Sequence, residues 1–68
     1  MMIGTEDLKL GDAFRWTGED IYTIISQPAR ETDSFSGRAK IRFRIFHPRF
    51  LKTYPMVIFP EEKVWLIE

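Results

Sequence analysis

The chain has 68 residues, which leaves room for one small domain (residues 1–68). Its ten Lys and Arg balance ten Asp and Glu, which excludes a protein that coats nucleic acid or membranes through bulk charge. The absence of cysteine excludes disulfides and, with a single histidine, a structural zinc site of the usual Cys/His kind. No export signal or apolar stretch of membrane-spanning length is evident, so we expect a cytoplasmic protein without metal, cofactor or membrane partner.

The first third of the chain predicts a helical turn followed by a hairpin. Thr5 can cap a short turn in which Glu6 and Asp7 lie near the positive end of the helix dipole. Residues 12–26 are expected to form a β-hairpin, because polar and apolar side chains alternate around Phe14 and a β-branched run follows.

The middle of the chain contains the clearest pattern. Segment 27–37 is polar and punctuated by proline and glycine, which predicts the longest loop or an irregular hairpin. Residues 38–46 then alternate between basic and apolar side chains, as in a strand with one basic and one apolar face.

The last third predicts a turn and two strands. Segment 47–52 is expected to form a helical or 3₁₀ turn, since a proline near its start is tolerated in a first helical turn. Residues 53–59 form a strand in which Pro55 indicates an edge or a bulge, and residues 64–67 complete the sheet.

Five short strands with tight turns predict an all-β fold, a small five-stranded barrel with one or two short helical turns. Segments Asp7–Phe14 (DLKLGDAF), Glu19–Ile24 (EDIYTI) and Val57–Trp65 (VIFPEEKVW) resemble the first strands and the final hairpin of SH3-like small barrels in the broad sense. The resemblance implies a layout and no particular ligand, since no acidic and aromatic cluster of a peptide-binding groove is evident. An OB-like barrel is the alternative.

Charge is segregated along the chain despite its neutral total. Six basic residues and no Asp or Glu lie between Ser34 and Pro60. Same-face neighbours on a strand are about 6.6 Å apart, and like charges at that distance repel by about 0.6 kcal/mol in water. Either acids on neighbouring strands or an anionic partner offsets this repulsion.

The basic strand therefore has two interpretations. Its cations either pair with Glu19, Asp20, Glu61 or Glu62, or they form a track for nucleic-acid phosphates, and arginine also suits the carboxylates of an acidic protein. Phe35 either stacks on a base or folds back over the open end of the barrel. The candidate nucleic-acid-binding residues are Arg38, Lys40, Arg42, Arg44, Arg49, Lys52 and Phe35.

Strands 54–59 and 64–67 are apolar on both faces, whereas a single-layer barrel buries only one face of each strand. Segment 1–3, the turn 46–51 or another protein molecule must cover the second face. This pattern predicts a protein-interaction or assembly module, self-association included. The candidate interface residues are Met56, Val57, Phe59, Trp65 and Ile67.

Catalysis is not expected. A covalent mechanism needs a nucleophile with a base in reach, and the chain offers three serines, no cysteine and one histidine that precedes a proline. The sequence predicts a non-enzymatic binding module without a small-molecule substrate, either for nucleic acid through residues 38–44 or for a protein through the apolar faces of 54–59 and 64–67.

Overall fold

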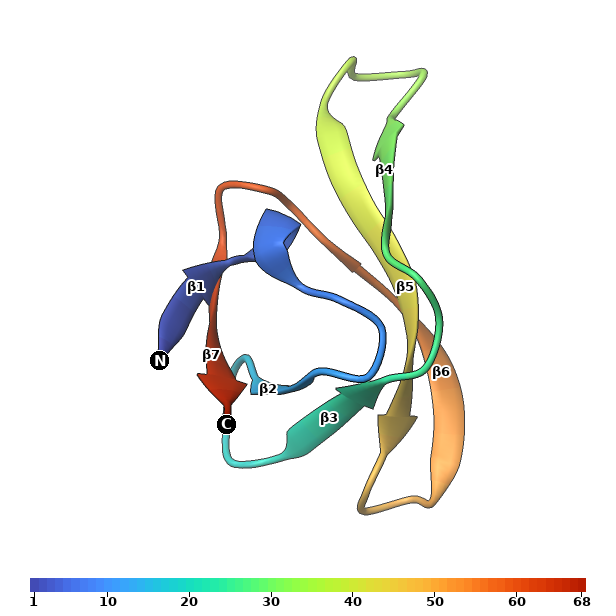
Figure 1. The fold of residues 1–68 in the computed structure, drawn as a ribbon. Coiled ribbons are helices and arrows are strands. Elements are labelled where there is room, and N and C mark those ends of the chain that lie inside the picture. Colours follow the sequence, from blue (N-terminus) through green and yellow to red (C-terminus); the bar gives the residue numbers. More distant parts are fainter.

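Backbone pairing in the computed structural model, which describes residues 1–68, joins seven strands into one curved antiparallel sheet (Figure 1). The strands are β1 (Met2–Gly4), β2 (Ala13–Arg15), β3 (Ile21–Ile24), β4 (Ala29–Thr32), β5 (Ala39–His47), β6 (Lys52–Ile58) and β7 (Lys63–Ile67), and a 3₁₀ turn, η1 (Thr5–Asp7), follows β1. The predicted all-β class is confirmed. No helix has the length and apolar character needed to cross a membrane.

Strand order follows a meander whose last strand returns beside its first. The sheet runs β1-β7-β2-β3-β5-β4, and β6 pairs with the other side of β5. β5 therefore pairs with three strands: β3 near its end, β4 near its start and β6 along its length. No pairing joins β1 to β4 or β6, so the ladders alone do not close the sheet on itself.

The core lies on the inner face of this curved sheet. Alternation along β5 buries Ile41, Phe43 and Ile45 and exposes the arginines between them. Phe14, which is fully buried, meets Phe43 edge to face with ring centroids 5.9 Å apart. The complete core cluster is Leu8, Phe14, Ile24, Ile41, Phe43, Ile45, Ile58 and Val64.

Thr5 does not cap the 3₁₀ turn, and the prediction of that role is wrong. Gly4 occupies the cap position, and no side chain bonds there. Thr5 is instead fully buried, and its hydroxyl donates to the carbonyl oxygen of Glu62 at 2.7 Å. A buried hydroxyl needs such a partner, and this one fastens η1 to the turn before β7.

Segment 27–37 is the hairpin of the two alternatives predicted for it, and segment 47–52 is a turn without a regular helix. The polar segment 27–37 contains β4, whose side chains are mostly exposed because the strand lies at an edge and pairs only with β5. Segment 47–52 forms no regular helix: the chain reverses there as the β5–β6 hairpin, around a single i→i+4 turn. Leu51 donates its N–H to the His47 carbonyl at 2.9 Å and has a φ of 53°, a left-handed conformation that cannot continue a helix.

The contrast between two phenylalanines tests this core. We expect Phe14→Ala to lower the free energy of unfolding by about 3–5 kcal/mol, since it leaves a cavity among buried side chains. Phe35→Ala, at a side chain that is 99% exposed, should change it by less than about 0.5 kcal/mol. Urea denaturation of both variants measures the difference, and comparable losses would contradict the placement of the core.

Candidate binding surfaces

The convex side of the sheet, which we call the outer face, carries part of each of the two residue sets predicted from the sequence. On β5 the basic side chains point outward, and in the ladder to β6 Arg42 lies opposite Val57 and Arg44 opposite Pro55. The Arg38 guanidinium lies 3.6 Å from the ring centroid of Phe59, a cation–π contact. The basic row and an apolar row are therefore neighbours on one surface.

Carboxylates on adjacent segments pair with three of the four outward cations. Arg38 bonds to Glu61. The other two pairs are Lys40 Nζ with Asp33 Oδ1 at 4.0 Å and Arg42 Nε with Glu31 Oε2 at 3.1 Å. Arg44 has no carboxylate partner and donates to the Thr53 hydroxyl at 3.3 Å. Such exposed pairs contribute roughly 0–1 kcal/mol each to stability, but they neutralise most of the charge of the row.

Arg49 and Lys52 do not extend this row. Arg49 lies in the β5–β6 turn, where its guanidinium bonds to Asp20 at 3.0 Å. Lys52 lies opposite His47 in the ladder, which places it on the alternate face from Arg44. The six basic residues predicted as one track are thus divided among two faces and a turn.

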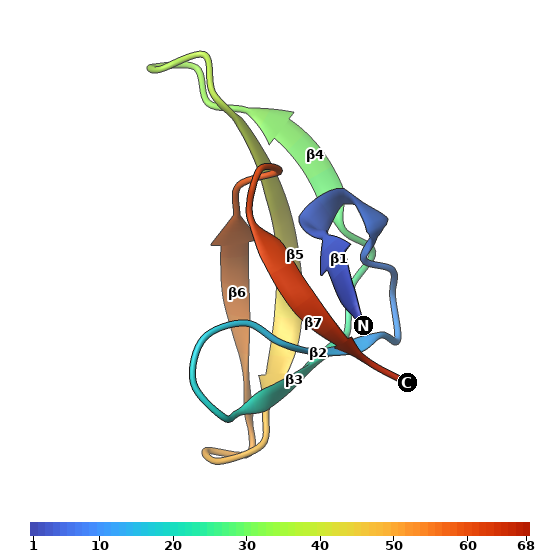
Figure 2. The same ribbon diagram turned by 90° about the vertical axis from the view of Figure 1, so that its left-hand side faces the viewer.

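Phe35 is held outward at the tip of the β4–β5 hairpin, which projects beyond the rest of the sheet (Figure 1 and Figure 2). Asp33 organises this tip: its Oδ2 accepts from the Ser36 hydroxyl at 2.7 Å and from the Ser36 N–H at 2.8 Å. These bonds, the hydroxyl first, lower the pKa of the Asp33 carboxyl from its ordinary value. The ring does not fold back over the sheet.

The apolar part of the outer face has no cover within the chain. Trp65 on β7 is 43% exposed and Val57 on β6 is 39% exposed, while Phe59 and Ile67 are partly exposed. Neither proposed cover lies over them, since β1 pairs with β7 edge to edge and the turn after β5 only extends its hairpin. Met56, by contrast, packs against the core from the inner face.

Aromatic side chains gather at one end of the sheet, in a cluster that the sequence does not reveal. The ring of His47 lies 4.6 Å from Phe50, 5.2 Å from Tyr22 and 6.0 Å from Tyr54, centroid to centroid. Its Nε2 is 3.7 Å from Oδ2 of Asp20. The members come from separate strands and turns, so only the folded sheet brings acidic and aromatic groups together here.

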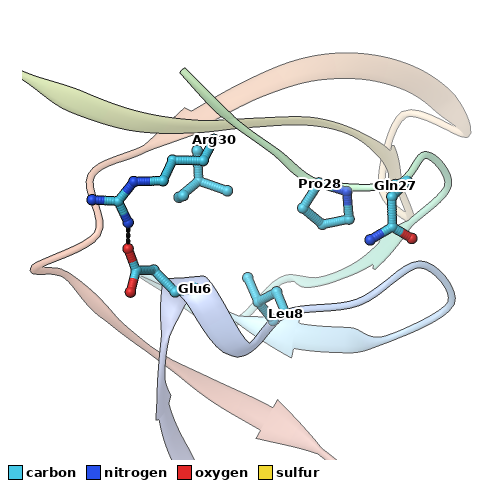
Figure 3. A pocket seen from close by; sticks show the side chains of 6 residues that line it. Glu6, Leu8, Gln27, Pro28 and Arg30 are labelled. Carbon is cyan, nitrogen blue, oxygen red and sulfur yellow. Dashed lines mark ion pairs between the residues drawn. The ribbon is translucent and has the colours of Figure 1, made fainter. Parts of the chain in front are cut away.

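A pocket of about 200 Å³ opens between β4 and the segment that follows β1 (Figure 3). Its floor consists of the buried side chains of Leu8 and Ile41. Glu6 and Arg30 face each other across one end as an ion pair. The complete lining is Glu6, Leu8, Gln27, Pro28, Arg30 and Ile41. No sequence motif marks this pocket, since its walls come from three separate segments.

Comparison with protein families, curated proteins and solved structures finds no match to this chain. No group of three or more His, Cys, Asp or Glu side chains is placed to hold a metal ion. Function is therefore inferred from the surfaces described above.

The Asp33 bonds predict a measurable pH dependence. Because the folded pKa is lowered, the ionised carboxylate stabilises the hairpin tip at pH values above its unfolded pKa, and this contribution is lost as pH falls through the folded pKa. We expect Ser36→Ala to raise the pKa of Asp33 toward its ordinary value in an NMR titration. Ser34→Ala, in the same exposed tip, should leave it unchanged, and equal titrations in all three proteins would contradict the assignment.

Proposed function

We propose that the protein is a non-catalytic protein-interaction module that binds its partner through the outer face of the sheet. The observation that carries the proposal is that Val57 on β6 and Trp65 on β7 remain well exposed, although their neighbours Ile58 and Val64 are buried. Because β6 and β7 do not pair, these are two separate apolar places on the outer face, and Val57 is the one beside the basic row. Exposed apolar patches with a polar rim mark interaction sites, and tryptophan is enriched among the residues that dominate binding energy.

The charges of the basic row suit a protein partner better than a phosphate backbone. Three of the four outward cations already have carboxylate partners, so a polyanion would have to compete with each of them. A protein surface that is acidic or of mixed charge can replace these carboxylates one at a time with its own, at the rim of the interface. Phe35 at the hairpin tip adds a fully exposed aromatic contact.

Nucleic-acid binding is the second candidate, and Arg44 is the observation that favours it. Its guanidinium lies on the outer face without a carboxylate partner, and its planar fork matches phosphate geometry. Exchange of the three existing pairs would extend the contact along β5.

We also propose that the sheet has an SH3-like rather than an OB-like layout. The order is a meander in which β7 returns beside β2, whereas an OB-fold is a Greek-key barrel. The absence of cysteine from the sequence supports a cytoplasmic setting for this module.

Photo-crosslinking at the outer face tests the proposed function. With a photoreactive phenylalanine analogue at position 65 or 57, in the cells that produce the protein, we expect discrete protein adducts from at least one of the two positions. The control position is Lys9, which is exposed on the segment after η1 and outside the outer face. Adducts that are absent, or equally abundant from Lys9, would contradict the proposal.

Anisotropy of labelled duplex DNA and RNA, at about 50 and 200 mM salt, tests the second candidate. The interaction module predicts no binding at the higher salt concentration. Four phosphate contacts would instead give a slope of log K against log salt near −3.6. A Glu31→Gln/Glu61→Gln variant releases Arg42 and Arg38, and it should tighten binding only if the basic row contacts phosphate.

A further inference from the structure

β4 has a free backbone edge whose hydrogen-bonding groups have no partner. β4 pairs only with β5. The bond from the Asp33 N–H to the Arg38 carbonyl, at 2.8 Å, shows which residues direct their backbone groups toward β5: Asp33 and every second residue before it. Backbone groups of alternate residues on an antiparallel edge strand point away from the neighbouring strand. Those residues are Arg30 and Thr32, and no turn or loop backbone bond reaches either of them.

The free edge of β6, on the other side of β5, is interrupted by a proline. Arg44 directs its N–H to the Ser26 hydroxyl and its carbonyl to the Ile25 N–H, away from β6. Pro55, its partner in the β6 ladder, therefore has its nitrogen at the free edge of β6, where it has no hydrogen to donate. Pro55 thus interrupts the edge of β6 between the outward N–H groups of Thr53 and Val57, whereas Arg30 and Thr32 give β4 two consecutive outward donors.

The pocket lies against this open edge. Arg30 is opposite Ile41 in the ladder, so both side chains belong to the inner face, where the pocket opens between β4 and η1 (Figure 3). Its volume of about 200 Å³ is below the roughly 300–1,000 Å³ of small-molecule sites, which suits one side chain. The floor is apolar, and the Glu6–Arg30 pair at the mouth has no net charge, so the fitting side chain is uncharged and apolar.

We propose that β4 binds an extended segment of a partner protein as an added strand, with one apolar side chain in this pocket. The segment would bond to the free N–H and carbonyl groups of Arg30 and Thr32. Its residue opposite Arg30 points to the same face as Arg30, into the pocket, and its neighbours in the segment point to the other face. This inference rests on the proposed function and names a second contact of the same module.

A displayed library of random 12-residue peptides is the probe. We expect selection on the folded protein to enrich alternating sequences with an aliphatic residue at a fixed position, and bound peptide to protect the Arg30 and Thr32 amides from hydrogen exchange. Thr32→Pro removes the outward donor without touching the β5 ladder and should weaken binding about tenfold or more. Gln27→Trp, at the exposed rim, should fill the pocket and have a comparable effect.

Thr53→Pro is the matched control, because it removes an outward donor from the interrupted edge of β6 and should leave peptide affinity unchanged. Failure to enrich peptides, binding that survives Thr32→Pro and Gln27→Trp in a folded protein, or equal loss with Thr53→Pro would each overturn the inference. A wild-type dimer in sedimentation that Thr32→Pro dissociates would overturn it in favour of pairing between two copies. Adducts from position 65 without peptide binding at β4 would leave the proposed function intact and remove only this inference.

Discussion

The alternation of side chains along β5 is the constraint on which the rest of the molecule depends. Ile41, Phe43 and Ile45 are inward and buried, so the residues between them must face water. Because β5 pairs with β3, β4 and β6, its register assigns a face to the residues of all three strands. A slip of one residue would bury arginines and expose the core, which fixes the register firmly.

A domain of this size cannot bury all the apolar side chains that it carries. The core cluster contains eight residues, whereas eleven large hydrophobic side chains are exposed. Single exposed side chains are ordinary, but here Val57 lies beside a row of paired charges, and neither Val57 nor Trp65 is covered. The short β1 strand extends the sheet sideways and adds no second layer, so it does not cover Trp65.

The sequence predicted those features that depend on residues close together in the chain. The alternation over 38–46 predicted β5, and Pro55 marked β6 as an edge strand, whereas the polar setting of Phe35 left open whether its ring is exposed. β4 was missed because its side chains follow no period-two pattern and its backbone forms the ladder with β5. The bond from Thr5 to Glu62, the aromatic cluster and the pocket join segments far apart in the chain, and no spacing in one sequence encodes such contacts. Of the acids proposed as partners of the basic row, only Glu61 pairs with it.

The face and the edge offer different kinds of recognition. Contact with an apolar face buries surface but does not orient the partner. Hydrogen bonds to the free backbone groups of Arg30 and Thr32 would instead align a bound segment along β4. That line continues into the hairpin whose tip is organised by Asp33. A strand that lies along β4 is therefore directed toward Phe35, whose exposed ring can contact it beyond the last backbone bond. The β4–β5 ladder thus connects the core residues of β5 to the open edge of β4 and to the hairpin tip that carries Phe35, the most exposed aromatic side chain of the protein.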